Sequence, residues 1–379
     1  MKVGVLTISS PDSGGVFQYT TSILDAVKVI ASSSNKYNFS QIRYQNFPKL
    51  LEKDIVIEEQ KTPIGLKLRR LLHTFTCIKI GMLAPDMDVD LIISPTITLL
   101  PYHMKKPYIV TIHDFQHEYY PDFFTLRERF SRKIGYKTAQ KASMVICESE
   151  YVKNDIKKFL GVNEDKIKVI LSPPPSYLYK IKLDFDKFKQ IKEKYGLPEK
   201  YLFYPAQFWY HKNHINLIRA LKYIKDKYHL EIPLILVGSK KSNFENVMNE
   251  IQKLGLGQQV KYLGYAPDED MPYLYKLATA LVMPTLFESV SMPIWEAFYL
   301  GCPVVSSNVC ALPEQVGDAG LLFNPNNVED MSEKIYKIWM DENLRQELIQ
   351  KGYERVKDLT IENYAKKWEK IIKEVVLKI

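Results

Sequence analysis

Several features that would assign the chain to a class are missing from its 379 residues. No run approaches the ~18 consecutive apolar residues of a membrane-spanning helix. The N-terminus, MKVGVLTISSPDSGG, lacks the cationic, apolar and small-residue order of a signal peptide. Cysteine is scarce, and Cys77, Cys147, Cys302 and Cys310 show no CxxC spacing, so neither a disulfide nor a zinc site is expected. The sequence predicts a cytoplasmic protein.

Signatures of nucleic-acid binding are also missing. The chain has no RGG tract, zinc-finger spacing or basic low-complexity tail, so nucleic acid is not expected as a partner. Its net charge of +8 and pI near 8.9 favour some other anionic partner, such as a phosphorylated ligand or an acidic lipid surface. The first strand is followed by SSPDSGG, which is not the GxGxxG of a nicotinamide-binding unit.

What the chain does have is a regular alternation of β-rich runs with helical patterns. The runs in the first half are VGVLTI, QIRY, LIISP, YIVTI, MVIC and IKVIL, and those in the second half are YLFYP, PLILV, VKYLGY, ALVM, PVVSS and GLLFNP. Such alternation predicts parallel sheets covered by helices, that is, an α/β chain of two Rossmann-like domains facing across a cleft. Three successive prolines, Pro173 to Pro175, favour neither strand nor helix and mark the link. We predict domains at residues 1–172 and 173–357, followed by a helix in 358–379 with an apolar stripe.

Ligands of open α/β sheets bind at the carboxyl ends of strands, so residues just after strands are the candidates. In the first half these are Gly14 and Gly15, which open a helix, and His113, which follows YIVTI. The glycines let a phosphate approach a helix N-terminus, or they form only a tight turn. His113 binds a sugar hydroxyl or phosphate, or is a loop histidine bonded to its own backbone.

In the second half, HKNH places Lys212 between a strand and a helix. A cation at a helix start is unfavourable on dipole grounds, so a bound anion would explain Lys212, whereas an exposed lysine without a ligand is the alternative. Gly238 and Lys240 follow the next strand. They could face the phosphate or the base of a bound ligand, or Lys240 could be a solvated surface charge.

Two acids stand in LVMPTLFESVSMPIWEAFYLGCPVV: Glu288 in a loop, and Glu296 about one turn inside a helix that Ser291 is expected to cap. A carboxylate accepts hydrogen bonds from two neighbouring hydroxyls, which suits the vicinal diol of a sugar. Either acid alone is explained by the helix dipole or by solvent. The pair, close to Lys212, favours a sugar-binding site.

These residues, taken together, resemble the retaining GT-B glycosyltransferases of family 4, whose signature is two glutamates separated by seven residues. The resemblance covers nearly the whole chain: the Gly14–Gly15 loop, His113, CESEYVKNDI, HKN at 211–213, LGYAPDEDMPYLYKLA and FES..MP..EAFYLGCPVV. It implies a transferase that takes a hexose from a nucleotide diphosphate sugar to a glycan or lipid-linked glycan. Similarity to O-antigen mannosyltransferases suggests mannose and a GDP-linked donor, with UDP-sugars left open.

The resemblance implies a role for each matching position. Glu288 would contact the donor sugar, Glu296 the ribose hydroxyls, and Lys212 the departing diphosphate. His113 would hold an outer sugar hydroxyl. The remaining positions would approach the sugar or the phosphates through their main chains: Gly14, Gly15, Val290, Ser291 and Met292.

Two departures from the family pattern affect the donor site. Members commonly have Gly-Arg where this chain has Ala206-Gln207, so Gln207 brings a hydrogen bond but no charge. Members often have Gly-x-Gly after the first glutamate, where this chain has Ser289-Val290-Ser291. Val290 is β-branched and does not readily take positive φ, which disfavours close backbone approach to the donor.

In such enzymes the main catalytic task would be to stabilise the charge on the leaving group, and family members need no metal. No DxD stands in a plausible metal-binding loop of this sequence, so neither a metal nor a cofactor is expected. The basic amphipathic segment 64–83 is either a helix on an anionic membrane or one packed on its own domain. The first would place the enzyme peripherally on the inner face of the cell membrane. Two alternatives remain: a GT-B sugar-nucleotide epimerase, and a catalytically silent nucleotide-sugar-binding partner.

Overall fold

The structure is a computed structural model that describes residues 1–9, 14–44, 47–57, 87–98, 101 and 106–378. The basic segment 64–83 and Cys77 lie outside the described residues. Two compact units make up the chain: unit 1 comprises Met1–Pro173 and Thr360–Ile379, and unit 2 comprises Pro174–Leu359. Among the described helices, none combines the length and apolarity needed to cross a bilayer.

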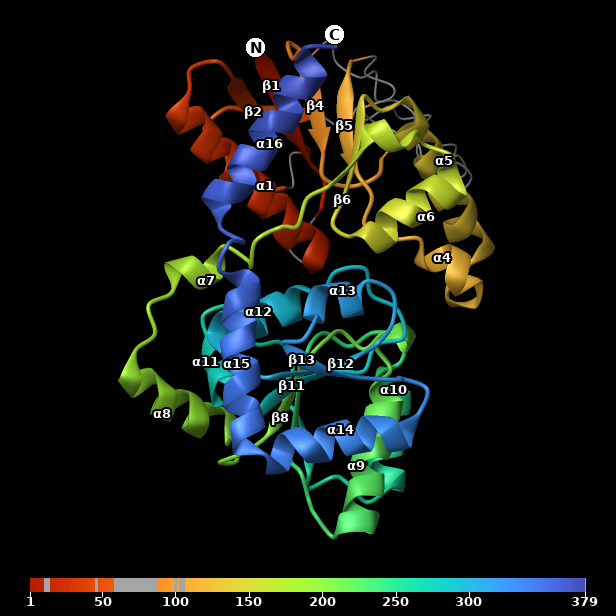
Figure 1. The fold of residues 1–379 in the computed structure, drawn as a ribbon, viewed down its shortest axis with the longest axis vertical. Helices are drawn as coiled ribbons and strands as arrows, with labels where there is room; N and C mark the ends of the chain where they lie inside the picture. Colours follow the sequence, from red (N-terminus) through yellow and green to blue (C-terminus); the bar gives the residue numbers. More distant parts are fainter. Residues whose placement is uncertain (10–13, 45–46, 58–86, 99–100, 102–105, 379) are drawn as a thin grey trace, which may run out of the picture. The chain divides into compact units, whose positions relative to one another are not determined.

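Unit 1 contains a parallel sheet of seven described strands in the order β3-β2-β1-β4-β5-β6-β7 (Figure 1). The strands are β1 Lys2–Thr7, β2 Asn38–Tyr44, β3 Asp54–Ile57, β4 Leu91–Ser94, β5 Tyr108–Thr111, β6 Met144–Cys147 and β7 Ile167–Val169. β4, β5 and β6 are buried along their whole length. This is why they read as uninterrupted apolar runs rather than alternating ones. β3 is the strand that the sequence patterns did not predict.

Unit 1 also contains the helices that accompany this sheet. They are α1 Gly15–Ser33, α4 Gln116–Tyr119, η2 Pro121–Phe123, α5 Leu126–Lys141, α6 Glu150–Leu160, η3 Glu164–Lys166 and α16 Ile361–Val376. α16 packs beside α1, as Figure 1 shows, and buries Tyr364, Trp368 and Ile372 of the predicted apolar stripe. The apolar stripe predicted from the sequence is therefore the face through which the C-terminal helix packs on unit 1.

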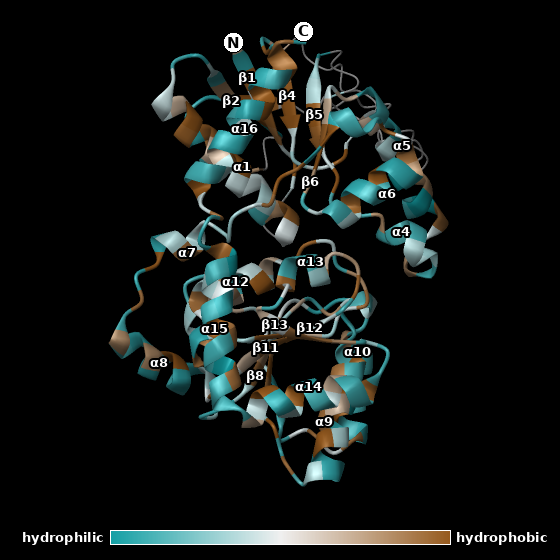
Figure 2. Cartoon of the chain, viewed as in Figure 1, coloured by the Kyte–Doolittle hydropathy of each residue, from teal (hydrophilic) through white to brown (hydrophobic). Residues whose placement is uncertain are grey.

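Unit 2 contains a second parallel sheet, with six described strands in the order β10-β9-β8-β11-β12-β13. Its strands are β8 Leu202–Pro205, β9 Leu234–Val237, β10 Val260–Tyr262, β11 Ala280–Met283, β12 Val304–Ser307 and β13 Gly320–Phe323. Figure 2 shows brown, apolar β-strands and helices with teal outer faces. The predicted α/β class, with two parallel sheets, is confirmed.

In unit 2, two helices precede the first strand and the other described helices follow strands. They are α7 Tyr177–Lys180, α8 Phe185–Tyr195, η4 Tyr210–Lys212, α9 His214–Tyr228, α10 Phe244–Lys253, α11 Met271–Leu277, α12 Met292–Leu300, α13 Leu312–Val316, α14 Val328–Met340 and α15 Glu342–Val356. α12 begins after Ser291, with a proline in its first turn as predicted. Cys147 and Cys302 are buried thiols, and burial raises the pKa of each to about 12. Both therefore behave as small hydrophobic side chains.

Candidate functional site

Two loops of unit 2 come together at the carboxyl ends of neighbouring strands β8 and β11. The loop after β8 carries Lys212, and the loop after β11 carries Glu288. The carbonyl oxygen of His211 accepts hydrogen bonds from the Leu286 N–H at 2.7 Å and the Thr285 hydroxyl at 3.0 Å. Because both bonds cross from one loop to the other, they hold the two loops together at this edge of the sheet.

Asn213 fixes the turn into α9 directly after Lys212. It adopts a left-handed conformation, with φ 56°, which asparagine tolerates better than most residues. Its side-chain amide donates to the carbonyl oxygens of Pro284 at 2.9 Å and Pro325 at 3.0 Å. Tyr204 donates its hydroxyl to the Lys212 carbonyl at 2.7 Å. The backbone that carries Lys212 is thus held from three directions.

The Lys212 ammonium forms an ion pair and a hydrogen bond with the Glu288 carboxylate. Each side chain is 18% exposed, so the pair is largely shielded and still reachable. Glu288 thus supplies a balancing anion for the cation at the start of α9. A bound diphosphate would compete with Glu288 for Lys212 and would free the carboxylate for hydroxyl groups.

Glu296 lies one turn into α12 and is 8% exposed. Tyr275 on α11 donates its buried hydroxyl to Glu296 Oε2, and Tyr177 on α7 also hydrogen-bonds the carboxyl. Burial raises the pKa of Glu296 to about 7; the two tyrosine hydrogen bonds oppose the rise and the Asp268 charge adds to it. The Glu296 carboxyl therefore takes up a proton at a higher pH than an ordinary glutamate does.

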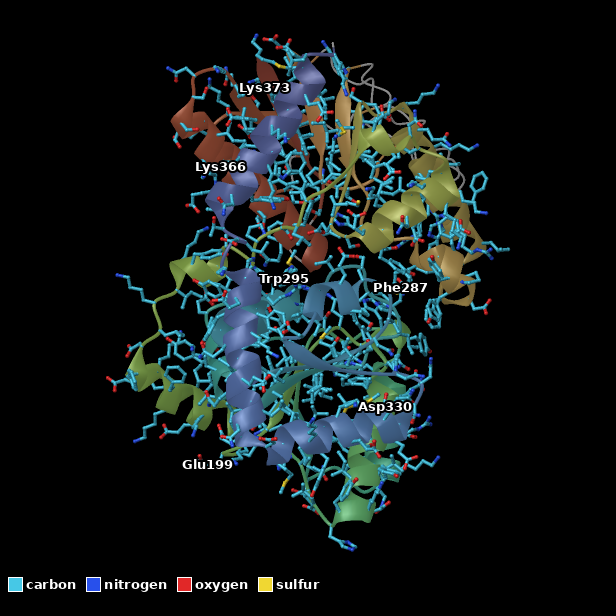
Figure 3. All side chains as sticks on the ribbon, viewed as in Figure 1. Glu199, Phe287, Trp295, Asp330, Lys366 and Lys373 are labelled. Atoms are coloured by element: carbon cyan, nitrogen blue, oxygen red, sulfur yellow. The ribbon has the colours of Figure 1, made fainter. Side chains whose placement is uncertain are left out.

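The two glutamates thus have different surroundings. Glu288 contacts Lys212, whereas Glu296 contacts tyrosines, and each follows a buried aromatic residue: Phe287 and Trp295, labelled in Figure 3. The helix periodicity of MPYLYKLA gives Tyr275 a buried position, where a phenol needs a hydrogen-bond partner. That signal could have found Tyr275, but nothing in the sequence indicated Tyr177.

Ser291 occupies the predicted N-cap position, but its hydroxyl makes no capping bond and is buried without a partner among the described residues. Its main chain is bonded instead to the side chain of Gln315 on α13. The Ser291 N–H donates to Gln315 Oε1 at 2.8 Å, and its contact with a sugar donor stays a prediction. Val290 does not adopt positive φ, as its β-branching predicts, and Met292 begins α12.

Gln207, Gly238 and Lys240 lie in the loops after β8 and β9. Gly238 has φ 146°, and a Cβ there would come within 2.3 Å of the Ala206 carbonyl oxygen, so these two loops approach as only glycine allows. Gln207 Oε1 accepts from the Trp209 indole at 2.9 Å. Lys240 lies over the Phe244 ring at 4.6 Å. Neither Gln207 nor Lys240 contacts Lys212 in the interactions of the described residues.

In unit 1, His113 lies after β5 with both ring nitrogens facing protein acceptors. Nε2 is 2.9 Å from the Pro95 carbonyl oxygen, and Nδ1 is 3.5 Å from Glu148 Oε2. Burial alone lowers the pKa of His113, but the Glu148 bond and charge, with the Pro95 carbonyl, raise it above its usual value. A sugar hydroxyl would have to replace one of these partners. The sequence reasoning missed Glu148, which is 7% exposed and accepts from Ser172 at 2.5 Å.

Gly14 and Gly15 are exposed at the start of α1. Gly14 has φ 60° and occupies the N-cap position, and its carbonyl accepts from the N–H groups of Phe17 and Gln18. This geometry fits both the tight turn and the phosphate-binding loop that the sequence left open. No group of three or more metal-ligating side chains occurs within the part of the chain that the structure describes.

The two parallel-sheet units define the fold as that of the GT-B class. Anabaena HepE, solved in complex with UDP and glucose, matches with a TM-score of 0.75 over 99% of this chain and 100% of that one, at 18% identity. At this identity the similarity concerns the fold. The two parallel-sheet units are those of the GT-B architecture.

Two glycosyltransferase family models match the chain. Residues 26–172 match the family described as Glycosyltransferase Family 4, and residues 185–355 match Glycosyl transferases group 1. It is 29% identical to the O-antigen chain mannosyltransferase B of Escherichia coli over 270 residues, 70% of this chain and 69% of the relative. It is 25% identical to the Escherichia coli serotype-specific mannosyltransferase WbdA over 59% of this chain, but spans only 27% of that relative. The chain is a glycosyltransferase, and the resemblance seen in the sequence is confirmed.

Proposed function

We propose that the chain transfers mannose from a nucleotide diphosphate sugar, GDP- or UDP-linked, to a glycan or lipid-linked glycan acceptor during cell-surface polysaccharide synthesis. Relatives named as O-antigen mannosyltransferases support the choice of mannose and of a glycan acceptor. The observation that carries the proposal is the shielded Lys212–Glu288 pair after β8 and β11, where family 4 enzymes are expected to bind the donor.

The reaction would break the bond between the anomeric carbon and the diphosphate oxygen and form one to an acceptor hydroxyl oxygen. The acceptor proton passes to the departing phosphate oxygen on the same face of the sugar, which retains configuration. Lys212 stabilises the charge that develops on the diphosphate. Glu288, released from Lys212, accepts bonds from sugar hydroxyls, and ionised Glu296 accepts bonds from the ribose. None of these steps uses a metal or other cofactor.

The proposal is tested by incubating the purified protein with GDP-mannose or UDP-hexoses and a mannose-containing glycan, with product linkage read by NMR. We expect an α-linked product without added metal. Lys212→Ala should lower kcat about 100-fold or more, because it removes a cation from the developing charge. Glu288→Gln should also lower it.

The matched control is Lys222→Ala, which breaks an exposed pair with Asp226 on α9 and should leave kcat unchanged. Conversion of the donor sugar without any acceptor would instead support an epimerase. Nucleotide binding without turnover of any donor would support a silent partner protein.

We also propose that the enzyme acts peripherally at the inner face of the cell membrane. Support comes from α5, whose outer face carries Lys133, Lys137 and Lys141 and begins with Leu126, 81% exposed, and Phe130, 56% exposed. This apolar and cationic combination is typical of helices that lie on anionic lipid. The role predicted for segment 64–83 stays a prediction.

A further inference from the structure

The side chain of Gln315 grips the main chain of Ser291. The Ser291 N–H donates to Gln315 Oε1 at 2.8 Å, and Gln315 Nε2 donates to the Ser291 carbonyl oxygen at 2.8 Å. Both residues are buried, at 3% and 2% exposure. Because one planar amide engages both polar groups of one residue, it fixes the orientation as well as the position of that residue.

The start of α12 has no capping bond from its own N-cap side chain, the Ser291 hydroxyl. In a capping box the third helical residue accepts the N–H of the cap through a Glu or Gln side chain, but here that residue is Ile294. Gln315, which lies 24 residues further along the chain, supplies the missing acceptor. The amide also leaves the buried Ser291 hydroxyl without a protein partner among the described residues.

Gln315 is itself held by the helix layer behind it. Arg355 on α15 donates through Nη2 to the Gln315 carbonyl at 2.8 Å and through Nε at 3.3 Å. Its guanidinium also lies against Gly317, where a Cβ would be 3.3 Å from Cζ. A continuous series of bonds therefore runs from α15 through α13 to the segment between Glu288 and Glu296.

We propose that Gln315 is a positioning residue for sugar transfer. It holds the Ser289-Val290-Ser291 segment, which stands where family members often have Gly-x-Gly, so that Glu288 keeps the orientation that donor binding requires. The inference rests on the proposed function of this loop. In this view a side chain of α13 holds in place a loop whose own residues supply no capping bond.

The test compares Gln315→Met, which keeps the length of the side chain and removes both bonds, with Gln259→Met. Gln259 is also buried in unit 2 and donates one bond of 2.7 Å, to the Ile232 carbonyl, away from the loop. Gln315→Met should lower kcat at saturating donor about 10- to 100-fold, as expected when a reacting group is misplaced. Gln259→Met should lower the melting temperature but not kcat per folded molecule.

A second variant, Gln315→Glu, gives a pH signature. Its carboxylate still accepts the Ser291 N–H, but it repels the Ser291 carbonyl oxygen until it is protonated and can donate. Relative to wild type, its kcat should therefore rise as pH falls, whereas that of Gln315→Met should not. The inference is wrong if kcat of Gln315→Met matches wild type while its melting temperature falls as in Gln259→Met.

Hydrogen exchange separates this inference from the proposed function, because it needs no donor. The Ser291 amide should exchange slowly in wild type and much faster in Gln315→Met. If wild type transfers no sugar from any donor, the proposed function fails. If the Ser291 amide exchanges equally in both proteins, the positioning role fails even in an active enzyme.

Discussion

At the scale of single residues, the lysine and the two acids of the proposed donor site are all bonded to protein groups. Lys212 is neutralised by Glu288, and Glu296 is hydrogen-bonded by Tyr177 and Tyr275. Ordinary ion pairs on the surface contribute little to stability, and a shielded pair costs desolvation that only good geometry offsets. The Lys212–Glu288 pair is therefore better explained by the donor binding that we propose than by the stability it adds.

Glu296 should make donor binding depend on pH. Its pKa of about 7 lies above the ordinary value of 4.5, so the folded protein keeps a proton that the unfolded chain loses. The stability from this proton is present below pH ~4.5 and is lost as pH rises through about 7. Ribose hydroxyls prefer the ionised form, so affinity for a nucleoside diphosphate should increase over the same rise.

Calorimetric titration of GDP and UDP between pH 5.5 and 8.5 checks this, with Glu296→Gln as the comparison. The variant should bind more weakly at pH 8 and lack the increase near pH 7. An equal pH dependence in both proteins would assign the titration to another group.

At the scale of secondary-structure elements, α5 is built to stay helical while it faces outward. Thr125 and Glu128 form a capping box at its start. Gly135, Tyr136 and Ala139 face the core, and the opposite face carries lysines that form no ion pair with the described residues. Unpaired like charges on one face cost stability through repulsion, which contact with an anionic surface would relieve.

Reversing three charges of this face, Lys133→Glu, Lys137→Glu and Lys141→Glu, should weaken binding to vesicles containing phosphatidylserine at least tenfold, since each basic residue contributes about 1 kcal/mol. The matched control reverses Lys366, Lys367 and Lys370 on α16, also exposed in unit 1 (Lys366 is labelled in Figure 3). Vesicle sedimentation at low and high salt measures both. Equal losses in the two variants would mean that net charge, not α5, governs binding.

At the scale of the whole molecule, the chain passes between its two units twice, at Pro173–Pro174 and at Leu359–Thr360. Lys212, Glu288, Glu296 and Gln315 all belong to unit 2, whereas His113 and Gly14 belong to unit 1. Each unit has its own sheet and core. The nucleotide contacts that we propose are therefore concentrated in one unit.

Nucleoside diphosphates should consequently stabilise unit 2 in particular. At 100 times its dissociation constant a ligand adds about 2.7 kcal/mol to the stability of the state that binds it. A calorimetric scan should show the transition of unit 2 moving up by several degrees with the preferred nucleotide, GDP or UDP, and by less in Lys212→Ala. An unchanged transition with every nucleotide would contradict the proposed donor.

The sequence by itself determined the order of strands and helices and the places where functional side chains leave the strands. Buried parallel strands require apolar runs, and helices that cover them require a periodic face, so both leave local patterns. The positions of Lys212, Glu288 and Glu296 followed from these patterns. β3 was missed because it is an edge strand among the described strands, with Val56 exposed, and so lacks the wholly apolar run of a buried strand.

Only the tertiary structure decided which groups meet. Lys212 and Glu288 are 76 residues apart, and Ser291 and Gln315 are 24 apart. His113 lies between the Pro95 carbonyl and Glu148, and Glu296 lies against Tyr275. Such partners are set by the register and packing of whole sheets, and hydrogen bonds between distant segments impose no period on the sequence. The sequence therefore determines which functional groups are present, and the fold determines which of them pair.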